Sequence, residues 1–330
     1  KEKLENKKVK VENKKVKIQI GELISRAKPK ENLDTLKRSI AKKLNIQIIS
    51  NVEILKAYHA FCKIESVKPD KFTENLLVKR RVRSLSGVAV VSVLTKPYPC
   101  PGKCLYCPTE KGMPKSYLSN EPAVMRAVLN DFDPARQIKT RLKSLRLTGH
   151  PTDKVELIII GGTWSFFPKK YQERFIKKCF DACNFKTSAT LGASHKINEK
   201  AKHRIIGITI ETRPDFINET EIKNLRRLSV TRVELGVQSV YDDVLKFNKR
   251  GTETKETIKA TKLLKDAGFK VCYHMMPNLP ESNLKQDLKM FQEIFSNPDF
   301  QPDLLKIYPC AILKQAPLYS LWKKGKYKPY

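Results

Sequence analysis

The sequence predicts an α/β protein, a partial (β/α)6 barrel preceded by a small basic α-helical domain. From residue 88 onward, six short apolar runs alternate with five segments of helical periodicity, which is typical of parallel strands joined by crossover helices. Before residue 85, lysines are dense and apolar residues recur near helical spacing. We therefore expect a helical domain at 1–84 and a barrel domain at 85–330.

The first domain combines positive charge with helical patterning. Residues 1 to about 20 are lysine-rich, a pattern that suits a solvated tail and an electrostatic arm for a phosphate backbone equally well. Ile18–Leu44 has helical spacing, and Pro29 should divide it into two helices because proline has no backbone N–H. Asn45–Tyr58 predicts a further helix.

A dense group of cations ends this domain, and we call it the basic run: Lys79, Arg80, Arg81 and Arg83. A solvated linker is one explanation of such a run. Its place shortly before the loop described below favours the other, a contact with a nucleic-acid backbone. We therefore predict that the basic run contacts a nucleic-acid backbone; charge alone does not distinguish RNA from DNA.

The barrel is predicted from its strands and helices in order. The strands are Val88–Leu94, Val155–Ile160, Ile205–Ile210, Arg232–Val237, Lys270–Met275 and Leu304–Tyr308. The helical segments are Glu121–Leu147, Lys169–Cys183, Glu219–Leu228, Lys255–Ala267 and Asn283–Phe295. The first helix should break at Asp131–Pro134, because the residue before a proline disfavours helical geometry. Parallel β/α barrels place their chemistry at the carboxyl ends of the strands.

The first strand leads into three cysteines, Cys100, Cys104 and Cys107, spaced C-x3-C-x2-C. Prolines and a glycine in this loop prevent regular structure, so the thiolates can converge on a soft metal centre. A four-iron cluster usually takes four cysteines, and three would leave one iron open to a small molecule. A disulfide would leave an odd thiol; zinc with a distant histidine stays an alternative.

Each later strand also ends in chemically useful residues. They are, in order, Gly161-Gly162-Thr163, Glu211-Thr212-Arg213, Gln238-Ser239, Met275-Met276-Pro277 and Lys306-Ile307-Tyr308. Two glycines let backbone approach a ligand, although a plain turn explains them as well. The carboxylate can accept hydrogen bonds from a polar ligand, and the amide can accept or donate them. One such group for each strand indicates a shared site.

Composition limits the class of protein and its partners. The formal net charge is +31, from 65 Lys and Arg against 34 Asp and Glu, which indicates a polyanionic partner, most simply nucleic acid. No run approaches the roughly 20 apolar residues of a membrane span, and no apolar signal core follows the lysine-rich start. Eight cysteines without a paired framework suit the reducing cytoplasm.

Together these motifs resemble the radical S-adenosylmethionine (radical SAM) superfamily and, more finely, the Elongator protein 3 family, which supplies the catalytic subunit of Elongator. The resemblance covers about residues 60–330. Besides the cysteines, it rests on Gly161-Gly162-Thr163-Trp164, Glu211-Thr212-Arg213-Pro214-Asp215, Glu234-Leu235-Gly236-Val237-Gln238-Ser239, His274-Met275-Met276-Pro277-Asn278-Leu279-Pro280 and Lys306-Ile307-Tyr308-Pro309.

The resemblance implies an activity and a role for each site residue. The family forms 5-carboxymethyluridine at the wobble uridine of tRNA from acetyl-CoA, by way of a 5′-deoxyadenosyl radical made from SAM at a [4Fe-4S] cluster. By this resemblance, the three cysteines bind iron. The SAM residues would be Gly161, Gly162 and Thr163 at the methionyl part, Glu211 and Gln238 at polar groups, and Met275, Met276 and Pro277 at adenine. Lys306 and Tyr308 would face the reacting groups.

One departure from the family affects the expected activity. Members usually continue into an acetyltransferase-like domain, and nothing in residues 1–330 resembles its pantetheine- and pyrophosphate-binding loop. A fragment, a split gene and a truncated reading frame all stay open. We expect the chain to hold cluster and SAM and to bind tRNA, but to support acetyl-CoA chemistry poorly. A homodimer or Elongator-like subunits are the expected protein partners.

Two other functions stay open at this point. One keeps the radical SAM chemistry and changes the substrate, to a different tRNA or a porphyrin-type molecule. The other is a non-catalytic tRNA-binding scaffold with a zinc or empty cysteine site. Five cysteines outside the motif are expected to be buried small apolar residues: Cys62, Cys179, Cys183, Cys272 and Cys310.

Overall fold

The computed structural model describes residues 14–27, 32–78 and 80–330. The chain forms two compact units. One comprises residues up to 89 together with 140–154, and the other comprises 90–139 together with 155–330. We call them the helical unit and the barrel unit. The segment 140–154 therefore joins the helical unit although it lies within the part of the sequence assigned to the barrel.

The helical unit contains α1 (Lys14–Ser25), α2 (Leu33–Leu44), α3 (Asn51–Ile64), α4 (Lys71–Leu77) and the 3-10 turn η1 (Arg81–Ser84). Helices α1 and α3 pack closely, since a Cβ on Gly21 would stand 2.4 Å from Phe61 Cβ. The predicted division of the first helical segment is confirmed by α1 and α2. The next helix begins later than predicted, because Asn45 takes the left-handed conformation that ends α2 and Ser50 caps α3.

The barrel unit is built on one sheet whose six strands follow the order of the sequence. The strands are β1 (Ala89–Leu94), β2 (Lys154–Ile160), β3 (Arg204–Thr212), β4 (Arg232–Gln238), β5 (Lys270–Met275) and β6 (Leu304–Ile307). The pairs β3–β4, β4–β5 and β5–β6 are parallel. The predicted partial barrel of six strands is confirmed, and β3 extends far enough to include Glu211.

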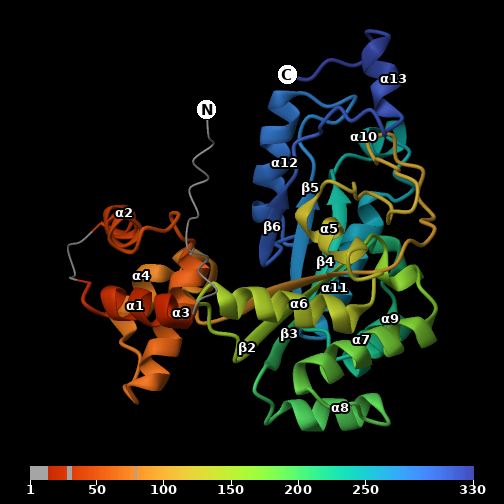
Figure 1. Ribbon diagram of the computed structural model, residues 1–330. Coiled ribbons are helices and arrows are strands. Elements are labelled where there is room, and N and C mark those ends of the chain that lie inside the picture. The colour runs from red at the N-terminus through yellow and green to blue at the C-terminus, as the bar shows by residue number, and fades with distance from the viewer. Residues whose placement is uncertain (1–13, 28–31, 79) are drawn as a thin grey trace. The chain divides into compact units, whose positions relative to one another are not determined.

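From β1 onward, helices lie between or after the strands in sequence, and α7 packs against β3 and α11 against β4 and β5 (Figure 1). They are α5 (Pro122–Val128), α6 (Pro134–Leu147), α7 (Lys169–Asn184), α8 (Leu191–Asn198), α9 (Glu219–Arg227), α10 (Asp242–Phe247), α11 (Thr254–Asp266), α12 (Leu284–Ser296) and α13 (Leu318–Lys323). The predicted break before Pro134 is confirmed: Asp131 and Phe132, both with positive φ, separate α5 from α6. The short helices α8, α10 and α13 were not predicted.

Candidate functional site

A cavity of about 450 Å³ opens where the strands of the barrel unit end. Every one of the six strands or the loop after it supplies part of its wall, which explains how residues so far apart in sequence meet. The wall includes Cys100, Cys104, Cys107, Tyr117, Gly162, Thr163, Glu211, Arg213, Glu234, Gln238, Arg250, His274, Met276 and Tyr308. Polar groups alternate with apolar surface in this wall, so the cavity is suited to a ligand of substantial size with both polar and apolar parts.

The cysteine loop brings its three thiols to this cavity. Cys104 and Cys107 are buried and Cys100 is half-buried, and none forms a disulfide. The Cys107 thiol lies 2.8 Å from the Ser116 hydroxyl. Burial raises the pKa of Cys107 to about 11, so this thiol is protonated at neutral pH until a metal takes the place of the proton.

Two backbone hydrogen bonds hold the cysteine loop against later parts of the chain. The backbone N–H of Leu318 donates to the Leu105 carbonyl at 2.8 Å, and the backbone N–H of Leu105 donates to the Asn248 carbonyl at 3.1 Å. Tyr106 is buried in an apolar cluster that includes Leu318 and Tyr327. Hydrogen bonds and apolar packing therefore hold the loop in place, although it contains neither helix nor strand.

The chemistry of the three loop cysteines fits an iron–sulfur cluster. Their thiols line one cavity and none is paired in a disulfide. Iron–sulfur clusters are held by cysteine thiolates.

The turn after β2 requires glycine for steric reasons. Gly161 has φ +129°, and a Cβ at this position would stand 2.1 Å from Thr95 Oγ1. Gly162, with φ +99°, and Thr163 line the cavity, whereas Gly161 is not among the described residues of its wall. Gly161 thus allows the tight approach to Thr95, and the next two residues face the ligand space.

Glu211 is a carboxylate with a raised pKa inside the cavity. Burial is the main cause of the rise; the nearby charges of His274 and Lys306 and a hydrogen bond from Tyr117 oppose it. The Tyr117 hydroxyl donates to Glu211 Oε2 at 2.7 Å. Tyr117 comes from the loop after the cysteines, so this bond ties that loop to the end of β3. Sequence reasoning missed Tyr117, because nothing near it in sequence marks it.

Gln238 reaches the cavity through an irregularity at the end of β4. The register between β4 and β5 shifts between Leu235 and Gln238, and Gln238 has φ +73°, which is rare for a residue with a Cβ. Its buried Oε1 has no hydrogen-bond partner in the described structure. A buried amide without a partner, held in a strained conformation, is typical of a ligand-binding group.

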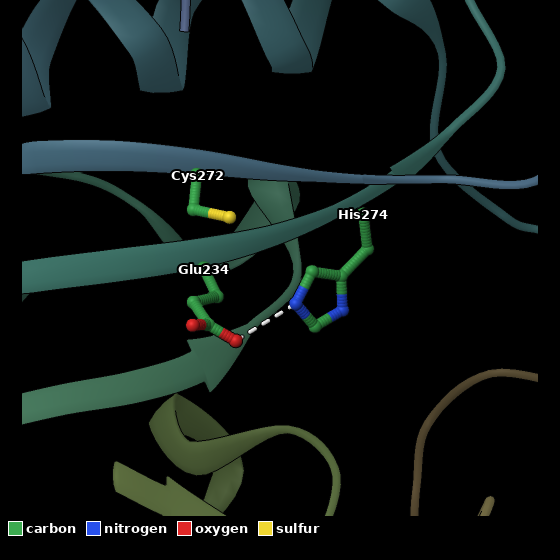
Figure 2. Close-up of side chains that lie close together, drawn as sticks. All are labelled: Glu234, Cys272 and His274. Carbon is green, nitrogen blue, oxygen red and sulfur yellow. Dashed lines mark hydrogen bonds and ion pairs between the residues drawn. The ribbon is translucent and has the colours of Figure 1, made fainter. Parts of the chain in front are cut away.

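On the same strand as Gln238, the buried Glu234 carboxylate interacts with two basic side chains. Its Oε2 lies 2.8 Å from His274 Nε2 and also pairs with the Lys306 ammonium. Figure 2 shows the carboxylate from β4 pointing toward the imidazole from β5, with the Cys272 thiol completing the group. Burial pushes the pKa of Glu234 up, but the bonds from His274 and Lys306 outweigh burial and hold it below its ordinary value.

This group is an internal ion pair facing the cavity. The Lys306 ammonium already pairs with the carboxylate that a metal ion would need as a ligand. We therefore do not assign the group as a metal site. Glu234 and His274 lie in the cavity wall, and the Tyr308 ring, beside the His274 ring at 5.3 Å between centroids, lies there too. Glu234 begins one of the motifs that carry the family resemblance, but sequence reasoning assigned it no role, because a buried acid in a strand has no local signature.

The predicted adenine-binding segment contributes one side chain to the described cavity wall. Met276 lines it, whereas Met275 is fully buried in the core and Pro277 lies outside the wall. The Met276 N–H donates to the Gln238 carbonyl at 2.9 Å, which keeps the end of β5 beside β4. The apolar contribution of this segment to the cavity therefore comes from Met276.

The basic run belongs to the helical unit. Lys79 lies outside the described residues, and Arg80 and Arg83 are exposed. Arg83 also lowers the pKa of Arg141, together with burial, which is the larger cause. The five cysteines outside the loop are all buried, as expected. No helix in the described segments is both long and apolar enough to cross a membrane.

Comparisons with known proteins identify the family of the chain. Residues 98–294 match the Radical SAM superfamily. The chain is 50% identical over 287 residues to the tRNA uridine(34) acetyltransferase of Methanocaldococcus infernus, covering 85% of this chain and 52% of that protein. It is 39% identical over 293 residues to the human Elongator complex protein 3, covering 84% and 53% respectively.

A solved structure of archaeal Methanocaldococcus infernus Elp3 with an N-terminal deletion (1-46) superposes with a TM-score of 0.64 at 47% identity. The match covers 74% of this chain and 50% of that one. The chain thus spans about half the length of these relatives, and the predicted resemblance to the Elongator protein 3 family is confirmed. Since the superfamily match includes all three cysteines and covers more than half of the residues, the chain belongs to the radical SAM superfamily.

Proposed function

We propose that this chain acts as a radical SAM enzyme in the formation of 5-carboxymethyluridine at the wobble uridine of tRNA, with acetyl-CoA as co-substrate. The observation that carries the proposal is the cavity in which three unpaired thiols meet residues from the ends of the six strands or the loops after them. The relatives named tRNA uridine(34) acetyltransferase support the tRNA substrate and the acetyl donor.

Membership in the superfamily implies a [4Fe-4S] cluster and SAM. When bound, the cluster supplies the electron that cleaves SAM to a 5′-deoxyadenosyl radical. Cys100, Cys104 and Cys107 would hold it. Three ligands leave one iron coordination position for SAM.

The cavity wall offers matching partners for the parts of SAM. The Glu211 carboxylate can accept hydrogen bonds from an ammonium group or ribose hydroxyls, and Gln238 has a free buried acceptor. Gly162 and Thr163 let backbone approach the methionyl part, and Met276 offers an apolar surface to adenine. Gly161, Met275 and Pro277 are not among the described residues of this wall.

The second half of the cavity would receive the groups that react. Tyr308 lines it, and Lys306 is held beside it by Glu234. Both the Lys306 ammonium and the neutral Tyr308 hydroxyl can donate hydrogen bonds to a carbonyl oxygen of the acetyl group or the uracil ring. Burial, opposed by Lys306, raises the pKa of Tyr308, so the hydroxyl keeps its proton at neutral pH.

A tRNA substrate suits the charge of the chain and the depth of the site. A net charge of +31 favours a phosphate backbone, and the exposed Arg80 and Arg83 of the basic run would contact it. Anticodon bases are single-stranded and can be splayed outward, and unstacking the wobble base costs only a few kcal/mol. Because cysteines without disulfides suit a reducing compartment, we take cytoplasmic tRNA as the substrate. Protein partners would be a second copy or Elongator-like subunits.

The deciding experiment is an anaerobic assay of the reconstituted and reduced full chain. We expect 5′-deoxyadenosine from SAM and more of it when tRNA is present. Because we expect residues 1–330 to support acetyl-CoA chemistry poorly, added acetyl-CoA should give little further stimulation and little carboxymethylated uridine. Replacing Cys100, Cys104 and Cys107 by serine should abolish SAM cleavage and iron binding. Cys62→Ser, in the core of the helical unit, is the matched control and should keep both.

The other outcomes identify the alternatives. SAM cleavage that tRNA leaves unchanged, in a chain that does not bind tRNA, would show a radical SAM enzyme with another substrate. A colourless preparation that binds zinc stoichiometrically and tRNA tightly after anaerobic reconstitution would show a non-catalytic scaffold. Either result would overturn the proposal.

A further inference from the structure

Arg213, at the end of β3, is a buried cation with an unusual set of contacts. Its side chain is 7% exposed. Nε and Nη2 donate to the two Asp215 oxygens, each at 2.9 Å, and Nη2 also donates to the Gly251 carbonyl at 3.0 Å. The guanidinium is therefore fixed in orientation by groups on one side.

The remaining nitrogen, Nη1, is buried and has no hydrogen-bond partner in the described structure. The position that a Cβ on Gly102 would take is 2.6 Å from Nη1, 3.5 Å from Cys104 Sγ and 3.7 Å from Cys100 Sγ. Nη1 and these two sulfurs thus surround the same small space. A side chain at position 102 would fill this space, so the glycine leaves it open between the guanidinium and the two thiols.

A buried donor without an acceptor is unfavourable and requires an explanation. The bonds to Asp215 and Gly251 fix the guanidinium with Nη1 facing the space beside Gly102 and the cysteine loop. The missing acceptor is explained if the loop carries electron-rich sulfur. Deprotonated cysteine thiolates and the sulfides of an iron–sulfur cluster both fit that description.

We propose that Arg213 is a positioning residue for the iron–sulfur cluster, donating from Nη1 to a cluster sulfur and raising the reduction potential of the cluster. Reduction adds one electron from an external one-electron donor, breaks no bond and makes the cluster more negative by one charge. A fixed guanidinium stabilises that added charge, and hydrogen bonds to the sulfurs and nearby net charge set such potentials. The inference depends on the cluster and not on the RNA substrate.

Asp215 provides a test of opposite sign, since its carboxylate partly neutralises Arg213. Arg213→Gln removes a positive charge and should lower the midpoint potential. Asp215→Asn removes a negative charge near the same loop and should raise it. Arg227→Gln is the matched control, because Arg227 is an ion-paired arginine on the outer helix α9, bound to Glu173 at 2.7 Å.

The measurement is a dithionite titration of the reconstituted full chain, followed by electron paramagnetic resonance of the reduced cluster, without SAM. Iron and sulfide content is determined for each variant. We expect the reduction equilibrium of Arg213→Gln to fall about tenfold, which is about 59 mV for one electron. Asp215→Asn should shift in the opposite direction, and Arg227→Gln should match the wild type.

Unchanged potentials in Arg213→Gln and Asp215→Asn, at full cluster content, would overturn the proposal. So would a variant whose SAM affinity falls while its SAM-free potential stays constant, because Arg213 would then bind the SAM carboxylate. If Arg213→Gln takes up no cluster, Asp215→Asn decides alone: an upward shift supports the proposal and no shift refutes it.

Discussion

Replacing Glu234 by glutamine tests whether the buried ion pair holds the reacting side of the cavity together. The side chain of Glu234 is 1% exposed and is the shared partner of His274 and Lys306. Glutamine keeps the shape and one acceptor oxygen but leaves the Lys306 ammonium without a countercharge. Removing one partner of a buried ion pair costs about 3–5 kcal/mol.

The expected cost here is lower, because the Lys306 side chain is one third exposed and water can solvate part of the ammonium group. We expect a loss of about 2 kcal/mol at pH 7. For a unit of this size, that loss lowers the melting temperature by about 4–8 °C. Calorimetry of the full chain under anaerobic conditions measures it. Glu173→Gln, which breaks a half-exposed pair with Arg227, should cost no more than about 1 kcal/mol.

The pH dependence gives the test a definite sign. The pKa of Glu234 is lowered in the folded protein from an ordinary value of 4.5, so its contribution to stability is present above pH 4.5. It is lost as the pH falls through the folded pKa. The gap between wild type and Glu234→Gln should therefore narrow below pH 4.5. Equal losses in Glu234→Gln and Glu173→Gln, or a gap that widens in acid, would refute this reasoning.

Three further predictions concern the glycine turn, the Glu211 carboxylate and the basic run. Gly161→Ala should lower the free energy of unfolding by about 1–3 kcal/mol, because the new Cβ meets Thr95 at a positive φ. Urea unfolding should show a smaller change for Gly192→Ala, whose Cβ would meet nothing within 4 Å. Equal changes in the two variants would contradict the steric argument. Tyr117→Phe removes a bond that lowers the pKa of Glu211, so SAM affinity, measured by calorimetry, should weaken with falling pH at a higher pH than in the wild type. Superimposable pH profiles would remove Glu211 from the titrating role. Neutralising the basic run should weaken tRNA binding and flatten its dependence on salt by about one unit of slope for each lost phosphate contact. An unchanged slope would place the run outside the interface.

The sequence alone determined the sheet and located the cysteine loop. Strands such as Lys270–Met275 were predicted with their observed limits, because a buried parallel strand is a continuous apolar run that can be seen locally. The cysteine loop was equally visible, since its three cysteines lie within eight residues. Short helices such as α8 were missed because few residues carry their periodicity.

Only the tertiary structure decided which polar side chains meet. Tyr117 and Glu211 are 94 positions apart, and Lys306 and Glu234 are 72 apart. Neither pairing follows from composition or periodicity, because contacts across strands depend on the register and on the residues that bulge at strand ends. The unpaired nitrogen of Arg213 beside Gly102 is likewise visible only once β3 and the cysteine loop lie together. Local hydrophobic pattern thus specifies the scaffold, whereas strand register and close backbone approach specify the chemistry at its edge.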